Sequence, residues 1–244
     1  MGSGRPPVPA REVATVELTD ARVLVAGASG ALGGQLADAL HGRGARVVAA
    51  GRDAGRTGAV AERVGTEPLL FDAVDTDSCR ATVAAAAEQL GGLDLLVVCV
   101  GVAGFGPAVE ADDAVVEELF AVDVLGPMAL VRAASAAMGD RGTVVVLSAI
   151  LADLPTARMA EYSAAKSALA TWLEVLRREE RRRLTVVDVR PPHLDTGLDS
   201  RALAGEPPRL PEPFPSADVV AAVVEAVEQD RREVVFVDGA LVVR

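Results

Sequence analysis

The sequence predicts an α/β protein, a doubly wound parallel sheet of about seven strands with helices on both faces in three α/β/α layers. Half of the 244 residues are apolar but only 3% are aromatic, which is typical of aliphatic helices packed on a Val-rich sheet. Short apolar runs alternate with Ala-rich stretches of helical periodicity, and a glycine-rich turn follows the first run. Continuous apolar strands separated by helices favour parallel pairing with right-handed crossovers.

Seven apolar runs are expected to form the strands. They lie at 22–26, 46–50, 69–71, 95–100, 143–148, 184–189 and 234–237. Helices are expected at 31–42, 54–63, 76–90, 112–138, 157–182 and 216–229. Each helical stretch is long enough to connect two parallel strands. Ligands of such sheets bind beyond the carboxyl ends of the strands.

Length and composition indicate one domain over 17–244, after a Pro- and Gly-rich disordered tail at 1–16. A formal net charge of −11 opposes binding to nucleic acid or anionic lipid, so we expect neither as a partner. The start of the chain lacks an apolar signal segment, and no apolar stretch is long enough to span a bilayer. Cys79 and Cys99 have no metal-binding spacing, so we expect no metal site and a reducing, cytoplasmic location.

The turn after the first strand reads GASGALG, with glycines three residues apart. Glycine lets backbone N–H groups approach a pyrophosphate at a helix N-terminus, where the peptide dipoles favour negative charge. The alternative is a plain strand-to-helix turn in a glycine-rich protein. The residues expected to bind the cofactor here are Gly27, Ser29, Gly30, Ala31, Leu32 and Gly33.

The second strand ends without the carboxylate that NAD sites usually place on the ribose hydroxyls. Ala49, Ala50 and Gly51 are followed there by Arg52. A guanidinium at this point can bind a 2′-phosphate, which favours NADP(H) over NAD(H). An ordinary exposed turn arginine is the alternative, since the chain has 23 arginines.

The only tyrosine and the only lysine of the chain, Tyr162 and Lys166, are four residues apart. On a helix this spacing puts them on one face, one turn apart. A neighbouring ammonium lowers the pKa of a phenol, which enables Tyr162 to act as a general acid–base group while hydride moves to or from a nicotinamide. The alternative is a pair of unrelated residues on a surface helix.

From about Leu18 to Gly239 the chain resembles the short-chain dehydrogenase/reductase family, through the glycine turn and the segment YSAAK at 162–166. The resemblance implies a Rossmann fold and an NADP(H)-dependent oxidoreductase that interconverts a carbonyl and a secondary alcohol on a small hydrophobic substrate. It implies that Tyr162 is the acid–base residue, and that Lys166 lowers its pKa and binds the nicotinamide ribose. It also implies a homodimer or homotetramer, built through the helices at 112–138 and 157–182.

Further cofactor contacts follow from the same resemblance. Asp72 is similar to the acid that meets the adenine ring, and Thr196 to the threonine at the nicotinamide end. The expected cofactor site also includes Ala73, Gly101 and Pro191.

The chain departs from the family pattern at several positions. The family's serine usually lies about thirteen residues before the tyrosine, where this chain has Ala149, so Ser148 is the nearest candidate to orient the substrate oxygen. A strand-end hydroxyl bonded to backbone is the alternative for Ser148. Asp123 replaces the asparagine of the family's proton relay, and either serves that relay or is a simple polar helix position. Pro192 stands where glycine is usual, which stiffens the nicotinamide loop.

An apolar substrate cleft is expected between 102–109, 149–160 and the loop at 193–215. The expected lining is Phe105, Leu151, Leu154, Met159 and Leu198, with 207–215 as a lid. A catalytically impaired cofactor-binding sensor or scaffold on the same fold is the competing function. A sugar-nucleotide epimerase or dehydratase is disfavoured, because the chain has no room for a larger substrate domain.

Overall fold

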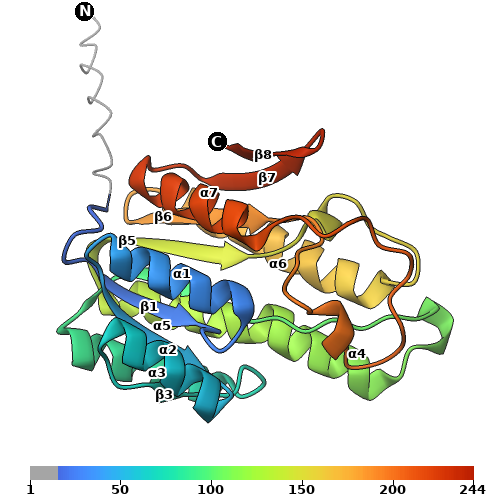
Figure 1. The fold of residues 1–244 in the computed structure, drawn as a ribbon, viewed down its shortest axis with the longest axis horizontal. Helices are drawn as coiled ribbons and strands as arrows, with labels where there is room; N and C mark the ends of the chain where they lie inside the picture. Colours follow the sequence, from blue (N-terminus) through green and yellow to red (C-terminus); the bar gives the residue numbers. More distant parts are fainter. Residues whose placement is uncertain (1–15) are drawn as a thin grey trace, which may run out of the picture.

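A computed structural model describes residues 16–244, which form a single eight-stranded sheet between two layers of helices (Figure 1). The tail expected at 1–16 lies outside the described residues except for Val16, which packs partly against the core. In spatial order the strands are β3 (Leu69–Leu70), β2 (Arg46–Gly51), β1 (Arg22–Ala26), β4 (Leu93–Val98), β5 (Met138–Leu147), β6 (Leu184–Arg190), β7 (Glu233–Val237) and β8 (Ala240–Val243). The doubly wound three-layer arrangement predicted from the sequence is confirmed, with one more strand than expected.

Alternate strand residues serve the two faces of the sheet. Val23 and Val25 of β1 join the core under one helical layer, whereas Leu24 and Ala26 join the core under the other. The first layer contains α1 (Ala31–Gly42), α2 (Ala54–Val64) and α7 (Ser216–Glu228). The second contains α3 (Thr76–Leu90), α5 (Gly126–Ala137) and α6 (Ala160–Glu179). Burial on both faces explains why the strands are continuously apolar.

Local signals set the ends of several helices. The side chains of Asp53 and Asp75 cap α2 and α3 by accepting backbone N–H groups of the first turn. The same helices end at Gly65 and Gly91, which adopt the left-handed conformation that favours glycine. The observed bounds of α1 and α3 are those expected from the sequence.

The stretch expected as a helix at 112–138 is helical over residues 113–137, but its hydrogen-bond register changes within it. It consists of α4 (Asp113–Phe120), a π-helical segment (Ala121–Leu125) and α5, and the chain enters β5 already at Met138. Pro127 lies in the first turn of α5 and lacks the N–H that a continuous helix needs, so the helical hydrogen-bond pattern changes just before it. The segment that changes register contains Asp123.

The final strand was missed, although the sequence contains its signal. Asp238 and Gly239 connect β7 to β8 with φ of 50° and 85°. A two-residue Asp-Gly turn with positive φ at both positions is a strong hairpin signal. β8 pairs with β7 in antiparallel orientation, whereas all other strand pairs are parallel.

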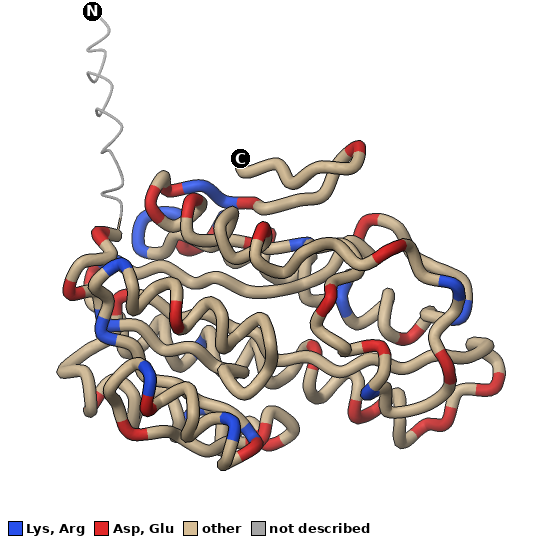
Figure 2. Tube along the Cα trace, in the orientation of Figure 1, with Lys and Arg blue, Asp and Glu red and all other residues tan. Residues whose placement is uncertain are grey.

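Charged residues lie mainly on the helices and loops around the sheet, and the acidic ones outnumber the basic ones along the trace (Figure 2). Within the described part of the chain, no helix is both long and apolar enough to cross a membrane.

Candidate active site

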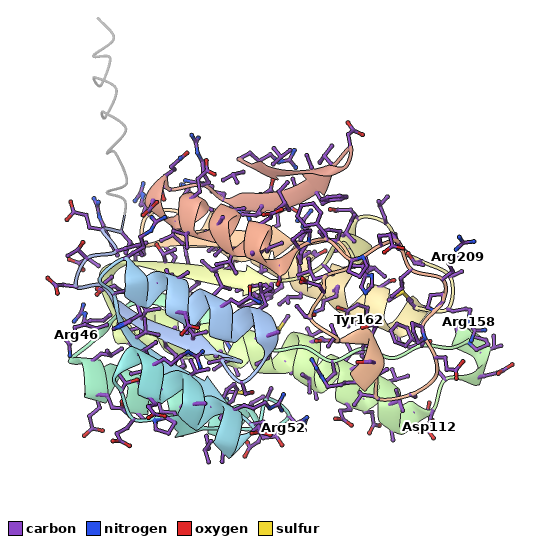
Figure 3. The ribbon with its side chains drawn as sticks, viewed as in Figure 1. Arg46, Arg52, Asp112, Arg158, Tyr162 and Arg209 are labelled. Carbon is purple, nitrogen blue, oxygen red and sulfur yellow. The ribbon has the colours of Figure 1, made fainter. Side chains whose placement is uncertain are left out.

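A cavity of about 560 Å³ opens beyond the carboxyl ends of the strands. Its walls come from the turn after β1, the segments after β4, β5 and β6, and α6. Figure 3 shows Tyr162 on this side of the molecule, between α6 and the loop that precedes α7. The apolar cleft expected from the sequence is confirmed, because all five expected side chains line the cavity together with part of the predicted lid: Phe105, Leu151, Leu154, Met159, Leu198, Leu210, Pro211 and Phe214.

The glycine turn is packed too tightly for side chains. A Cβ on Gly27, which has a φ of 93°, would lie 2.6 Å from the backbone of Cys99, and one on Gly33 would lie 2.3 Å from the Gly27 carbonyl oxygen. No side chain caps α1 at Gly30 and no acidic residue lies in its first turn. The N–H groups at the start of α1, from Ala31 onward, are therefore available to an anion, and the turn fits the pyrophosphate of a dinucleotide.

Ser29 and Leu32 complete this turn in different ways. Leu32 is buried and lines the cavity, as Gly30, Ala31 and Gly33 also do. Ser29 is half-buried and lies against Gly51, where a Cβ would come within 2.7 Å of the Ser29 hydroxyl oxygen. The turn is thereby held against the end of β2.

Besides Gly27 and Ser29 of the turn, three of the expected cofactor contacts lie outside the cavity lining. Arg52 is exposed at the end of β2, and no ion pair with it occurs among residues 16–244 (Figure 3). Asp72 is exposed after β3 and accepts a hydrogen bond from the Val74 N–H, while Ala73 is buried against Gly126. These residues follow β2 and β3, on the β3 side of the glycine turn.

Tyr162 and Lys166 lie together in the buried face of α6. Their exposed fractions are 7% and 3%, and the Lys166 Nζ is 5.6 Å from the centroid of the Tyr162 ring. Both side chains line the cavity. The alternative of two unrelated residues on a surface helix is therefore wrong.

Asp123 joins this pair from the π-helical segment. Its Oδ1 lies 3.3 Å from the Lys166 Nζ and accepts a hydrogen bond of 3.1 Å from the Val102 N–H. The side chain is fully buried, and its Oδ2 has no hydrogen-bond partner among the described residues. Gly101 permits this close approach, because a Cβ there would lie 3.1 Å from Asp123 Oδ1. The alternative of a simple polar helix position does not describe this buried ion pair.

Burial and charge act against each other on these three groups. Burial raises the pKa of Tyr162, Lys166 lowers it in part, and Asp123 raises it further, so that the pKa of the phenol is above its ordinary value. Lys166 lowers the pKa of Tyr162 as expected, but burial disfavours the phenolate more than the ammonium favours it, so the net direction is upward. Burial also raises the pKa of Asp123 against the opposing effect of Lys166. For Lys166, the lowering of the pKa by burial is outweighed by Asp123, Tyr162 and Asp188.

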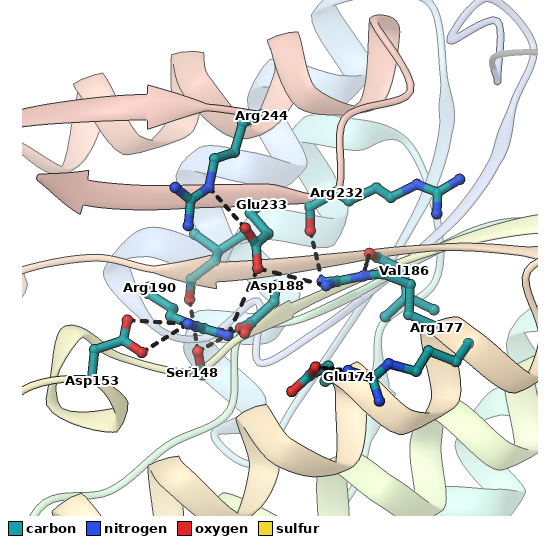
Figure 4. A network of polar contacts seen from close by, with 12 residues as sticks. Ser148, Asp153, Glu174, Arg177, Val186, Asp188, Arg190, Arg232, Glu233 and Arg244 are labelled. Atoms are coloured by element: carbon teal, nitrogen blue, oxygen red, sulfur yellow. Dashed lines mark hydrogen bonds and ion pairs between the residues drawn. The ribbon is translucent and has the colours of Figure 1, made fainter.

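Ser148 lies at the end of β5 and lines the cavity. Its hydroxyl donates to Asp188 Oδ1 at 2.5 Å, and it makes only a longer contact of 3.4 Å with the Val189 carbonyl oxygen. Figure 4 shows that Asp188 in turn contacts Arg190. Ala149, next along the chain, has no hydroxyl to offer. The alternative of a hydroxyl bonded to backbone accounts only for the longer Val189 contact, whereas the short bond goes to the Asp188 side chain.

Asp188 is the functional-site neighbour that sequence reasoning missed. It is fully buried in β6, between Val187 and Val189. A charged residue inside a continuously apolar strand is the signal that could have identified it, because buried carboxylates require partners.

The loop after β6 closes the cavity. Pro191 is buried, and both Pro191 and Thr196 line the cavity. The ring of His193 contacts the Pro211 carbonyl oxygen at 3.0 Å, which joins the start of the loop to the lid. Cys99 also lines the cavity, but burial raises the pKa of its thiol to about 12. Among residues 16–244, no group of three or more His, Cys, Asp or Glu side chains is arranged to hold a metal ion.

Comparisons with known proteins identify the family. The family model described as short chain dehydrogenase matches residues 21–206. Dehydrogenase/reductase SDR family member 7B of Danio rerio is 26% identical over 240 residues, covering 90% of this chain and 78% of that protein. A short-chain dehydrogenase from Burkholderia cenocepacia, solved in complex with NADP, has a TM-score of 0.77 and 28% identity, with coverage of 87% of this chain and 92% of the other.

A short-chain dehydrogenase/reductase from Burkholderia phymatum, solved in complex with NAD, has a TM-score of 0.82 at 20% identity. The alignment covers 89% of each chain, and at this identity it shows a common fold. The family model matches more than half of the chain, at residues 21–206. The chain therefore belongs to the short-chain dehydrogenase/reductase family of oxidoreductases.

Proposed function

We propose that this protein is an NADP(H)-dependent oxidoreductase that interconverts a carbonyl and a secondary alcohol, with Tyr162 as the acid–base residue. The observation that supports this most strongly is the burial of the only tyrosine and the only lysine of the chain one helical turn apart in one cavity. The apolar cavity walls favour a small substrate that is mostly hydrocarbon.

The proton chemistry follows from the surroundings of Tyr162. The nicotinamide supplies or accepts hydride when it is bound. In the reductive direction Tyr162 donates its phenolic proton to the substrate oxygen as the carbon receives hydride, which converts the carbonyl to an alcohol. Lys166 stabilises the phenolate that remains, and the steps reverse for oxidation. The raised pKa of Tyr162 keeps the acid form ready at neutral pH.

We propose that Asp123 holds Lys166 in place. We also propose that it is the last group of the path that returns a proton to Tyr162. Its Oδ1 binds the ammonium, while its buried Oδ2 is without a partner among the described residues. A buried polar atom of this kind usually contacts an ordered water.

The proposed cofactor site runs from the nicotinamide end to the adenine end. The nicotinamide end is proposed to contact Lys166, Tyr162, Thr196, Pro191 and Gly101. The pyrophosphate is proposed to contact the turn residues Gly27, Ser29, Gly30, Ala31, Leu32 and Gly33. Arg52 is proposed for the 2′-phosphate, with Asp72 and Ala73 at the adenine. The exposed guanidinium of Arg52, without an ion pair in the described part of the chain, supports NADP(H).

Fluorescence titration with NADPH and NADH tests this preference. We expect tighter binding of NADPH, and about tenfold weaker binding of NADPH by the Arg52→Ala variant, because a charge-assisted bond to phosphate is lost. Arg56→Ala is the matched control, since Arg56 is already paired with Asp53 at 3.2 Å. Equal or better binding of NADH by the wild-type protein would refute the assignment to Arg52.

The Tyr162→Phe variant tests the catalytic assignment. It keeps the buried ring and removes only the proton donor, so NADPH binding should remain while kcat falls by about 100-fold or more. Turnover at the wild-type rate would sink the proposed role of Tyr162. The measurement is NADPH oxidation across a panel of small ketones and aldehydes.

The competing proposal is a cofactor-binding sensor or scaffold on the same fold. Two observations favour it, because both leave the substrate oxygen without a serine donor. The Ser148 hydroxyl already donates to Asp188, and Ala149 has no hydroxyl. Tight NADPH binding without turnover across the same panel would support this competing function.

We also propose a homodimer or homotetramer, located in the cytoplasm. The helices expected to form the contact leave apolar side chains exposed, with Leu125 and Val175 at 52% and 45%. The reducing compartment suits the two free cysteines.

A further inference from the structure

The Ser148 hydroxyl lines the cavity, but its single hydrogen is directed away from the substrate. Its partner Asp188 Oδ1 is at 2.5 Å, within the range of O–H···O⁻ bonds. Its other contact, the Val189 carbonyl oxygen, is also an acceptor. Since both partners accept, the Ser148 hydroxyl must be the donor.

The charge of Asp188 fixes this direction. Asp188 is fully buried, and its Oδ2 accepts a hydrogen bond of 2.7 Å from the Arg190 Nε. The same guanidinium donates to both oxygens of Asp153 at 2.9 and 3.1 Å (Figure 4). Arginine remains protonated in proteins, so it holds Asp188 as a carboxylate, which can only accept. Asp188 therefore cannot return a hydrogen to Ser148.

Because its hydrogen is already donated, the Ser148 hydroxyl can only accept a hydrogen bond from a ligand, through the lone pairs of its oxygen. No donor from residues 16–244 contacts this oxygen. Ser148 also lines the same cavity as the Tyr162–Lys166 pair. The cavity thus presents Tyr162 as a donor and Ser148 as an acceptor beside the reacting group.

We propose that Asp188 is a positioning residue that fixes Ser148 as a hydrogen-bond acceptor, so that the site selects α-hydroxy ketones and the corresponding vicinal diols. This inference rests on the proposed function and names its substrate class. A simple ketone has no hydrogen for Ser148, whereas a hydroxyl on the adjacent carbon donates to Ser148 while Tyr162 binds the carbonyl oxygen. The apolar walls accommodate the remaining hydrocarbon.

Steady-state reduction with NADPH compares 2-hydroxycyclohexanone with 2-methoxycyclohexanone, which has no donor. We expect a KM about tenfold lower for the hydroxy ketone in the wild-type protein. The reason is that the hydroxy ketone donates a hydrogen bond to the buried Ser148 oxygen, whereas the methoxy ketone leaves that oxygen without a donor. Both ketones take the same proton from Tyr162, so the ratio of the two KM values does not depend on the pKa of Tyr162.

The Asp188→Asn variant reverses the polarity of the Ser148 bond. Its side-chain oxygen keeps the Arg190 bond, and its NH₂ group donates to Ser148, whose hydrogen then turns to the cavity. The preference for the hydroxy ketone should disappear or reverse. Asp153→Asn is the matched control, because it removes a carboxylate from the same Arg190 without touching Ser148, and it should keep the preference. Ser148→Ala should lose the preference, and it serves as the second variant if Asp188→Asn does not fold.

Calorimetric binding of trans-1,2-cyclohexanediol and trans-2-methoxycyclohexanol, with NADPH present, gives a readout without turnover, because NADPH cannot oxidise an alcohol. The wild-type protein should bind the diol about tenfold more tightly. Equal binding, no binding of either alcohol, or a preference that persists in Ser148→Ala would overturn the inference. A protein that prefers the diol but reduces no ketone would refute the proposed function alone, and one that reduces both ketones with equal KM values would refute this inference and leave the proposed function standing.

Discussion

Lys166 is buried beside the Asp123 carboxylate and the Tyr162 phenol. Its Nζ lies 3.3 Å from Asp123, and the charge of Asp188 also acts on it. The ammonium is therefore shared between a permanent neighbour, Asp123, and the phenolate that forms on Tyr162 only during the reaction. The pKa of Tyr162 stays above its ordinary value despite the nearby lysine mainly because burial disfavours the phenolate, and the charge of Asp123 adds to this effect.

The Asp123→Asn variant should move the pH dependence of alcohol oxidation to lower pH. Oxidation needs the phenolate, and the rate therefore rises as pH passes the pKa of Tyr162. Asp123 raises that pKa, so removing its charge lowers the pKa and brings the rising limb to lower pH. The measurement is kcat/KM against pH, with Glu117→Gln on the exposed side of α4 as the control for a lost carboxylate. An unchanged profile in Asp123→Asn would show that Asp123 is uncharged in the working site.

The sequence predicted Tyr162 and Lys166 because each residue type occurs once in the chain. It did not predict the net direction of the Tyr162 pKa, which depends on how completely the pair is buried. Nor did it predict Asp188, whose role depends on the register that places β6 beside β5, with Asp188 opposite Val146.

At the scale of elements, the turn before α1 depends on close contact between backbones. A Cβ on Gly33 would overlap the Gly27 carbonyl oxygen, whereas one on Gly42, at the other end of α1, would meet nothing within 4 Å. The two glycines thus provide a matched pair within one helix.

Gly33→Ala should destabilise the protein by about 1–3 kcal/mol through overpacking and should weaken NADPH binding. Gly42→Ala should be neutral or stabilise by up to about 1 kcal/mol, because alanine is the better helix former. Urea unfolding and NADPH titration check both variants. If Gly33→Ala bound NADPH as tightly as Gly42→Ala does, the turn would not be the pyrophosphate site.

Element boundaries followed from the sequence where local chemistry sets them, as at the Asp caps and Gly ends of α2 and α3. The π-helical change of register between α4 and α5 was missed because apolar periodicity continues through it. The close approach of Gly126 to the Ala73 carbonyl oxygen, at 2.5 Å from an added Cβ, involves chain segments that periodicity does not relate.

At the scale of the whole molecule, two apolar cores lie on either side of the sheet. Leu125 in the π-helical segment and Val175 on α6 are instead exposed, on the helices expected to form a contact between copies. We propose that these two side chains are covered in that contact.

Val175→Glu should therefore shift the protein from a homo-oligomer toward monomer, as measured by size-exclusion chromatography with light scattering. Val109→Glu is the control, because Val109 is 94% exposed in the 3₁₀ turn at Ala108–Glu110, away from α6. A monomeric wild-type protein, or an oligomer that Val175→Glu leaves intact, would contradict the proposed assembly.

The sequence by itself determined the doubly wound sheet, the glycine turn and the Tyr162–Lys166 pair, because these depend on periodicity and on spacing within one element. Tertiary structure alone decided what surrounds them. The partners of Lys166 and Ser148 are Asp123 and Asp188, which are 43 and 40 residues away along the chain. Strand register and the π-helical segment bring these carboxylates into the site, and burial there decides which protons each group holds.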